Sequence, residues 1–325
     1  MPIHIQQPDD RLLSSGKSER PDDLDYYEYL PIIDRPRLDW PNGARLAVWF
    51  APNIEFYELM PPENPARAAW PPPVPDVPGY AARDYGNRVG FWRLIEVMDR
   101  FGLRASAALN VAVCDHHPEV IAAMRERKWE FFSHGIYNSR YTHGMSEAQE
   151  RALIEDAFET VERHTGTRLR GWLSPALANT ERTPDLLAEY GIAYSCDFMH
   201  DDQPFPLKVA TGRLISVPYS VEINDGAAYQ RRLFSPQHFA EAIKAQFDQL
   251  YAEGGRVMCI ALHPYLSGHP YRLGPLTEAL EYITGHSHVW FATGAEIADW
   301  YYAHHYDTMV KHLAARGSMP TRTPP

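Results

Sequence analysis

The chain has few cysteines and no long apolar run. Cys114, Cys196 and Cys259 are the three cysteines among 325 residues, and they are widely spaced. An odd, dispersed set predicts neither a disulfide framework nor a zinc knuckle, and it favours a reducing compartment. The sequence contains no stretch of about 18 apolar residues, which is the length that a membrane-spanning helix needs. The polar start of the chain also lacks the apolar core of a signal peptide. We therefore expect a cytoplasmic protein without a membrane partner.

Positive charge is also scarce. The 31 Lys and Arg residues are outnumbered by 42 Asp and Glu residues, which gives a formal net charge of -11. A nucleic-acid-binding protein normally needs a basic surface, so we expect no nucleic-acid partner and favour a small-molecule substrate. Several common binding and catalytic motifs are absent from the sequence: a glycine-rich dinucleotide fingerprint, a Walker loop, a Gly-x-Ser-x-Gly elbow and a His-Glu-x-x-His helix.

The composition predicts one large domain with two flanking segments. An apolar fraction of 45% is enough for a full core. Residues 1–43 show no sustained periodicity, which indicates either an arm that wraps a neighbouring surface or subunit, or disorder. Residues 44–316 form the predicted catalytic domain, in which the proline-rich loop 61–78 is expected to cover a pocket. The tail 317–325 is expected to be disordered.

Strand-like and helix-like segments alternate through the predicted domain. About seven strand–helix units emerge, and this count favours a barrel-like β/α array over an open Rossmann sheet. The strand-like segments are 45–51, 105–111, 129–134, 170–173, 192–196, 214–218, 257–262 and 289–291. Helices are expected over 88–101, 118–127, 146–164, 183–190, 236–253 and 275–284, and after Thr293. Capping-box patterns at Ser146 and Thr293 mark two of the helix starts.

Three of the strand-like segments run into a residue that can move protons or bind a metal. Glu55 follows the first of them, and His134 and His263 follow two others. Because ligands bind at the carboxyl ends of parallel strands, we expect these side chains to share one pocket. Loss of hydration there would raise the pKa of Glu55 and suit it to general acid or base catalysis. The alternatives are a solvated loop acid for Glu55 and a hydrogen-bonded core histidine for His134.

Further candidates lie near the same strand ends. Trp172 is expected either to line the pocket or to join the core, and Asp197 is the better acidic candidate after the strand 192–196. His269 precedes a proline, which favours an extended backbone that holds the imidazole in place. His269 and Arg272 are expected to contact the substrate or to brace their loop. Glu58 is a weaker candidate than Glu55.

The order of several short motifs resembles the polysaccharide deacetylase superfamily, which is also called the NodB homology domain. The motifs are residues 40–45 (WPNGAR), 84–92 (DYGNRVGFW), 133–135 (SHG), 171–172 (GW), 261–263 (ALH) and 293–297 (TGAEI). The resemblance covers about residues 25–305. Within the superfamily, the chain is similar to the branch that contains cofactor-free allantoinase and cyclic imide hydrolase. It implies a distorted (β/α)7 barrel and assembly as a homo-oligomer.

The sequence departs from this family at the residues that hold its metal. Metal-dependent members carry an acidic pair after the first strand and a His-x-x-x-His motif. Here Phe56 and Tyr57 stand beside Glu55, and Asn138 stands where the second histidine would be. A firm zinc site wants three protein ligands, so we expect no metal and no other cofactor. The alternative is zinc held by His134 and Glu55.

These observations predict a hydrolase of carbon–nitrogen bonds other than peptide bonds, with a small amide, cyclic imide or ureide as substrate. Glu55 would activate water, His263 would protonate the departing nitrogen, and His134 would stabilise the oxyanion or share the proton transfer. The substrate would be oriented by Asn138, Arg140, Trp172 and Arg272. One alternative is a metal-dependent N-deacetylase of acetylated sugars. Another is a binding protein without activity on a degenerate deacetylase barrel.

Overall fold

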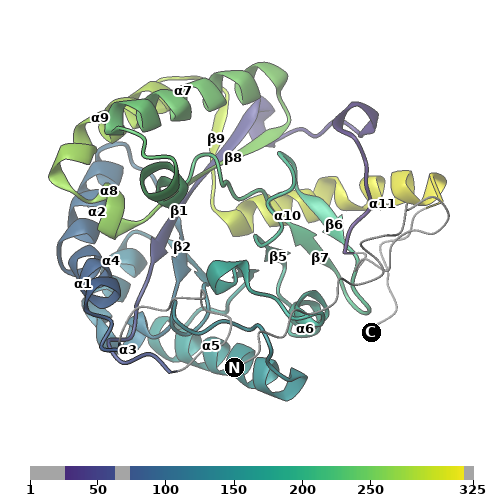
Figure 1. The fold of residues 1–325 in the computed structure, drawn as a ribbon. Coiled ribbons are helices and arrows are strands. Elements are labelled where there is room, and N and C mark those ends of the chain that lie inside the picture. The colour runs from purple at the N-terminus through teal and green to yellow at the C-terminus, as the bar shows by residue number, and fades with distance from the viewer. Residues whose placement is uncertain (1–25, 63–73, 318–325) are drawn as a thin grey trace, which may run out of the picture.

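A curled, mainly parallel sheet forms the centre of the molecule (Figure 1). The computed structural model describes residues 26–62 and 74–317. Seven of the described strands run parallel in the spatial order β7-β5-β4-β3-β2-β1-β8. They are β1 (Leu46–Ile54), β2 (Ser106–Leu109), β3 (Glu130–Ser133), β4 (Gly171–Trp172), β5 (Tyr194–Ser195), β7 (Leu214–Ser216) and β8 (Arg256–Leu262). This arrangement confirms the predicted distorted β/α barrel.

Two short strands and one loop complete the sheet. Strand β6 (Phe205–Leu207), which the sequence pattern did not reveal, pairs with β7 in the antiparallel direction. Strand β9 (Val289–Phe291) pairs with the first three residues of β1. The segment after β7 reaches β8, where the Ala261 N–H donates to the Ile223 carbonyl at 3.0 Å. The open side of the curled sheet is therefore bridged by a loop and not by a regular strand.

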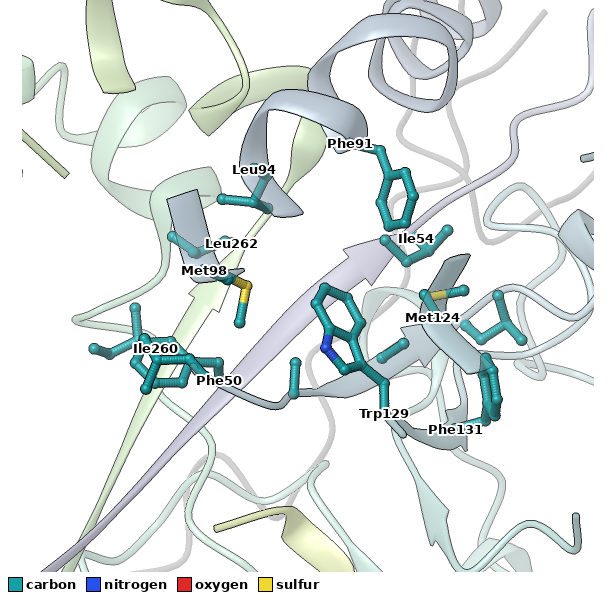
Figure 2. Close-up of a cluster of buried hydrophobic side chains, with 14 of the residues drawn as sticks. Phe50, Ile54, Phe91, Leu94, Met98, Met124, Trp129, Phe131, Ile260 and Leu262 are labelled. Carbon is teal, nitrogen blue, oxygen red and sulfur yellow. The ribbon is translucent and has the colours of Figure 1, made fainter. Parts of the chain in front are cut away.

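The strands bury both of their faces, because side chains alternate between them. From β1, Val48, Phe50 and Ile54 face the helices, whereas Ala47, Trp49 and Ala51 face the inside of the curled sheet. Figure 2 shows the outer cluster, in which residues of β1 and β8 pack against Phe91, Leu94 and Met98. The next side chains on this inner face after Ala51 are those of Asn53 and Glu55, because every second residue faces the same side.

The helices surround the sheet as the predicted alternation requires (Figure 1). The longer helices are α1 (Val77–Tyr85), α2 (Phe91–Arg100), α4 (Pro118–Glu126), α5 (Glu147–Thr165), α6 (Thr183–Glu189), α7 (Pro236–Glu253), α9 (Pro270–Thr284), α10 (Gly294–His304) and α11 (Tyr306–Ala315); the short ones are α3 (Val113–His116) and α8 (Pro264–Ser267). The predicted capping boxes at Ser146 and Thr293 are confirmed at the starts of α5 and α10.

Several helices differ from the sequence-based expectation, and the short helices α3 and α8 and the last helix α11 were not predicted. Helix α1 was not predicted, and it begins at Val77 inside the stretch expected to be a loop. Its start is fixed by Asp76, whose side chain accepts a hydrogen bond from the Gly79 N–H at 2.9 Å. Helix α9 begins at Pro270, five residues before the expected Pro275, because a proline is well tolerated in the first helical turn.

The segment before β1 lies against the sheet of its own chain. Leu30, Leu38 and Trp40 are buried, and Arg35 Nη1 bonds Asp201 Oδ1 at 2.6 Å. The first part of the expected arm (1–25), most of the proline-rich loop (63–73) and the tail beyond Gly317 lie outside the described residues. None of the described helices combines the length and apolar character needed to cross a bilayer.

Candidate active site

The structure brings the three strand-end side chains together. Glu55 Oε1 lies 3.3 Å from His263 Nε2 and 3.9 Å from His134 Nε2. Each of the three residues is at most 8% exposed. A carboxylate and two imidazoles therefore share one buried point at the carboxyl ends of β1, β3 and β8.

Local structure around the strand ends explains this convergence. Asn110, which follows β2, accepts a hydrogen bond from the Phe56 N–H at 2.9 Å and donates to the carbonyl of His134. This single side chain ties the segment after β1 to the segment after β3. Gly135 has a φ of 70°, a left-handed conformation that glycine adopts without steric cost. The chain can thus turn directly after His134, as expected from the sequence.

His263 is held by a carboxylate that the sequence did not reveal. Asp225 Oδ1 accepts from His263 Nδ1 at 2.6 Å, and Asp225 Oδ2 accepts from the His263 backbone N–H at 2.8 Å. Ser267 Oγ donates to Asp225 Oδ2 at 2.5 Å. Burial lowers the pKa of His263, but the carboxylates of Asp225 and Glu55 outweigh it and raise this pKa to about 10. His263 is therefore an imidazolium whose Nε2 proton faces Glu55.

Glu55 is more strongly ionised than expected. Burial alone would raise the pKa of Glu55, but the positive charges of His263 and Arg83 lower it to about 2. Arg83 Nε donates to Glu55 Oε2 at 3.2 Å. The expectation of a raised pKa was wrong, because it considered the lost hydration and not the two neighbouring cations. Glu55 is a carboxylate throughout the physiological range.

His134 presents an unprotonated nitrogen to the site. Its Nδ1 lies 2.9 Å from the carbonyl oxygen of Leu173, which can only accept a hydrogen bond. The proton of the neutral ring is therefore on Nδ1, and Nε2 carries a lone pair toward Glu55. Burial lowers the pKa of His134 and keeps the ring neutral. This tautomer cannot donate a hydrogen bond from Nε2 to an oxyanion, so the expected oxyanion role of His134 is not supported.

The three side chains open into a cavity with a volume of about 320 Å³. Its wall combines aromatic, amide and charged groups with a few aliphatic ones. They include Asn53, Tyr57, Arg83, Asn138, Tyr141, Leu173, Ser174, Ala176, Leu177, Tyr219, Arg231 and Tyr265. Ala176 and Leu177 have φ values of 53° and 56°, which are costly for residues with a side chain. Strained backbone of this kind is often found where a wall is shaped for binding.

Close packing of glycines brings Arg83 to the site. A Cβ atom on Gly90 would lie 2.0 Å from the Pro264 carbonyl oxygen, and one on Gly268 would lie 2.3 Å from the Gly90 Cα. The segment that follows α1 can therefore press against α8, which begins directly after His263. This contact carries Arg83 at the end of α1 to the cavity wall.

Of the predicted substrate-binding residues, the structure places Asn138 in the cavity wall and Asp197 directly behind it. Asn138 Nδ2 donates to the Tyr57 hydroxyl at 3.2 Å, and the buried Oδ1 has no hydrogen-bond partner among the described residues. Asp197 accepts from the backbone N–H and the hydroxyl of Ser174, a wall residue, at 2.6 and 2.8 Å. Burial raises the pKa of Asp197 to about 6. Asp197 therefore supports the wall without lining it.

Four other expected contacts lie away from the cavity. Trp172 points outward into the core between sheet and helices, which was the alternative expectation for it. Arg140 pairs with Glu58 at 2.6 Å, and neither residue lines the cavity. The expectations for His269 and Arg272 as substrate contacts also need correction, because His269 stacks on Tyr85 and Arg272 lies over the ring of Tyr229. These two residues brace the segment after His263, which was the alternative expectation for them.

The donor set does not fit a divalent metal. Within residues 26–62 and 74–317, no three His, Cys, Asp or Glu side chains are placed to hold a metal ion together. Glu55 already contacts two cations, Arg83 and His263, at 3.2 and 3.3 Å. A third cation at the same carboxylate would be repelled by both, and Asn138 offers an amide where zinc prefers a nitrogen ligand. His134 and Glu55 alone make an inadequate zinc site.

Comparisons with known proteins identify several relatives. The family model described as polysaccharide deacetylase matches residues 80–195. A Schizosaccharomyces pombe protein assigned to the polysaccharide deacetylases is 28% identical over 308 residues, which cover 85% of this chain and 95% of the relative. A peptidoglycan deacetylase from Helicobacter pylori is 22% identical over 249 residues, which cover 66% of this chain and 84% of the relative.

Solved structures show the same relationship. The crystal structure of the allantoinase PuuE is similar with a TM-score of 0.75 and 28% identity, and the match covers 88% of this chain and 99% of that one. A polysaccharide deacetylase homologue from Pseudomonas aeruginosa is similar with a TM-score of 0.74 and 29% identity, again over 88% and 99% of the two chains. Both matches span almost the whole length of the solved chains.

Proposed function

Because this chain belongs to the polysaccharide deacetylase superfamily, we propose that it hydrolyses a carbon–nitrogen bond, other than a peptide bond, in a small amide, cyclic imide or ureide without a metal ion. One observation carries the proposal: a buried carboxylate, Glu55, lies 3.3 Å from an imidazolium, His263, that a second carboxylate orients. Such an array can remove a proton from water and deliver one to a leaving nitrogen.

In the proposed reaction, Glu55 and His134 orient the attacking water. Glu55 Oε1 and His134 Nε2 are both hydrogen-bond acceptors, and 3.9 Å separates them. One water molecule can donate a proton to each, which turns an oxygen lone pair toward the substrate carbonyl. Glu55 then takes the proton as water attacks, and His134 shares the orientation of the nucleophile.

Glu55 and His263 titrate as a pair, so the proton that Glu55 takes from water and the proton that His263 gives to nitrogen belong to one coupled system. The charge of His263 is a main cause of the low pKa of Glu55. His263 gives its Nε2 proton to the departing nitrogen only after water has attacked, and Glu55 then loses that neighbouring cation. At 3.3 Å the proton that Glu55 took from water can then return to His263. The resting charges of the pair are restored after each turnover.

The cavity fits a small substrate. Its volume of about 320 Å³ is at the low end of the range for ligand pockets. The wall offers aromatic faces at Tyr57 and Tyr265 beside the amides of Asn53 and Asn138. Planar rings that carry alternating carbonyl and N–H groups match these surfaces. The similarity to an allantoinase structure supports a ureide or a related cyclic compound.

A second candidate function follows from the names of the other relatives. The peptidoglycan deacetylase of Helicobacter pylori and the polysaccharide deacetylase homologues suggest removal of an acetyl group from an acetylated sugar. The same Glu55 and His263 could serve that reaction, since it also cleaves a carbon–nitrogen bond. The cationic Arg83 beside Glu55 favours the metal-independent reaction over a deacetylase that needs zinc.

A substrate panel tests the proposal. The wild-type protein and His263→Ala are incubated with allantoin, hydantoin, succinimide and N-acetylglucosamine oligomers, and the metal content of the protein is measured. We expect ring opening of at least one cyclic compound, with a rate that falls by about 100-fold or more in His263→Ala. Acetate release from the oligomers in proportion to bound zinc would support the second candidate. Inactivity toward the whole panel would contradict both.

A further inference from the structure

We propose that Arg83 is a catalytic residue that stabilises the developing oxyanion. This inference rests on the proposed hydrolysis. Arg83 lines the cavity, and its Nε donates to Glu55 Oε2 at 3.2 Å. A fixed positive charge therefore lies beside the carboxylate that activates water.

The surroundings of Arg83 hold its guanidinium group rigidly. Its central carbon lies 3.8 Å from the ring centroid of Tyr57 and 4.2 Å from that of Tyr265. Nη2 donates to the Tyr265 hydroxyl at 3.1 Å. The side chain is 15% exposed, and it is charged at every pH at which the protein is folded. Donors that are fixed before reaction are the most effective in stabilising a transition state.

One nitrogen of Arg83 is left for the substrate. Nε and Nη2 are used by Glu55 and Tyr265, whereas Nη1 makes no hydrogen bond with any of the described residues. The two imidazoles next to Glu55 are engaged. His134 carries its proton on Nδ1 and donates it to Leu173. The Nε2 proton of His263 faces Glu55 and is needed by the leaving nitrogen.

The proposed step can be written with its protons and electrons. The oxygen of water attacks the carbonyl carbon while Glu55 takes one proton of the water, and the π electron pair of the C=O bond moves onto its oxygen. This oxyanion faces Arg83 Nη1, which stabilises it without transferring a proton. When the oxyanion collapses, the carbon–nitrogen bond breaks, its electron pair stays on nitrogen, and nitrogen takes the Nε2 proton of His263. The products are a carboxylic acid and an amine or amide.

If Arg83 acted only through Glu55, its removal would have a different effect on the rate. Arg83 is one of the charges that lower the pKa of Glu55, so its removal raises that pKa in either case. If lowering the pKa were its whole function, the variant would recover full activity once the pH exceeds the raised value. If Arg83 binds the oxyanion, the maximal rate stays low on the pH plateau as well.

The experiment measures kcat between about pH 5 and pH 11 with the panel compound that the wild-type protein hydrolyses fastest. Arg83→Gln is expected to lose about 100-fold or more in plateau kcat, as when one oxyanion-hole donor is removed. Arg83→Lys keeps the charge without the planar group and should lose less. Millimolar guanidinium should restore part of the activity of Arg83→Ala. The matched control is Arg88→Gln, since Arg88 lies in the same segment, is 68% exposed and pairs with Asp84.

The possible results separate the hypotheses. A plateau kcat of Arg83→Gln within about threefold of wild type would overturn the oxyanion role and leave the hydrolase intact. An equal loss in Arg88→Gln would also overturn it, because the effect would then not be local to the cavity. Thermal melts show whether the variants fold; if Arg83→Ala and Arg83→Gln do not, Arg83→Lys decides by its plateau kcat. A wild-type protein inactive toward the whole panel refutes the proposed function, and the role of Arg83 with it.

Discussion

Replacing Asp225 by asparagine removes the charge behind His263 while keeping the size of the side chain. Asp225 Oδ1 lies 2.6 Å from His263 Nδ1 and is a principal cause of its raised pKa. An opposite charge at this distance changes a pKa by about 1–3, so the pKa of His263 should fall from about 10 to between about 7 and 9. His263 must be protonated to act as the acid. The pH at which the rate falls on the alkaline side of the pH–rate profile should therefore decrease by the same amount.

The rate of Asp225→Asn should also fall at neutral pH. His263 with a pKa between about 7 and 9 stays largely protonated at pH 7, so the loss there comes from the orientation of the ring, which the neutral amide no longer fixes through Nδ1. We expect a loss of about 100-fold to 1,000-fold in kcat, which is within the contribution of a general acid. The carboxylate accepts bonds from His263 and Ser267, and an amide nitrogen can accept neither. This mismatch should cost about 1–3 kcal/mol of folding free energy and lower the melting temperature.

The assay records kcat against pH for the wild-type protein, Asp225→Asn and Ser267→Ala. Ser267→Ala removes one hydrogen bond from Asp225 and keeps its charge, so its alkaline limb should stay near that of the wild-type protein. If the limb of Asp225→Asn does not move and its plateau kcat stays within about threefold of wild type, the acid is not His263 held by Asp225.

Two further outcomes test the corrected placement of Arg140 and the glycine contact beside α8. Arg140→Ala should change kcat/KM by less than about threefold, because Arg140 pairs with Glu58 away from the cavity; a tenfold rise in KM would restore it as a substrate contact. Gly90→Ala should destabilise the fold by about 1–3 kcal/mol, because its Cβ would lie 2.0 Å from the Pro264 carbonyl. Gly274→Ala in α9, where a Cβ meets nothing within 4 Å, should instead stabilise by about 0.5–1 kcal/mol; equal melting temperatures for the two variants would refute the packing argument.

The sequence predicted the repeating architecture better than its irregular parts. Strands of several apolar residues, such as β1 and β8, were visible in the sequence because both of their faces are buried. Strand β6 was missed because three residues around Pro206 carry too little pattern. Helix α1 was missed because it follows directly on the proline-rich stretch, where proline normally indicates a loop.

The site was predictable as far as side-chain alternation along strands reaches. Glu55 and His263 continue the inner-facing positions of β1 and β8, so their convergence follows from the sheet itself. Trp172 was expected either to line the pocket or to join the core, and the choice stayed open because β4 has two residues, too few to show which of them faces inward. Arg83 and Asp225 come from outside the strands and reach the site through tertiary packing. The glycines in residues 86–90 indicated that another segment packs closely against them, but the sequence did not show which segment this is.

The central claim is that Glu55 and His263 hydrolyse a carbon–nitrogen bond without a metal. The most direct test is the rate of ring opening of the best cyclic substrate after exhaustive chelation, measured for the wild-type protein and for Glu55→Gln. We expect the chelated wild-type protein to keep its full rate, and Glu55→Gln, which cannot accept a proton from water, to lose about 1,000-fold. A rate that disappears on chelation and returns with stoichiometric zinc, or a Glu55→Gln variant as active as the wild-type protein, would contradict the account.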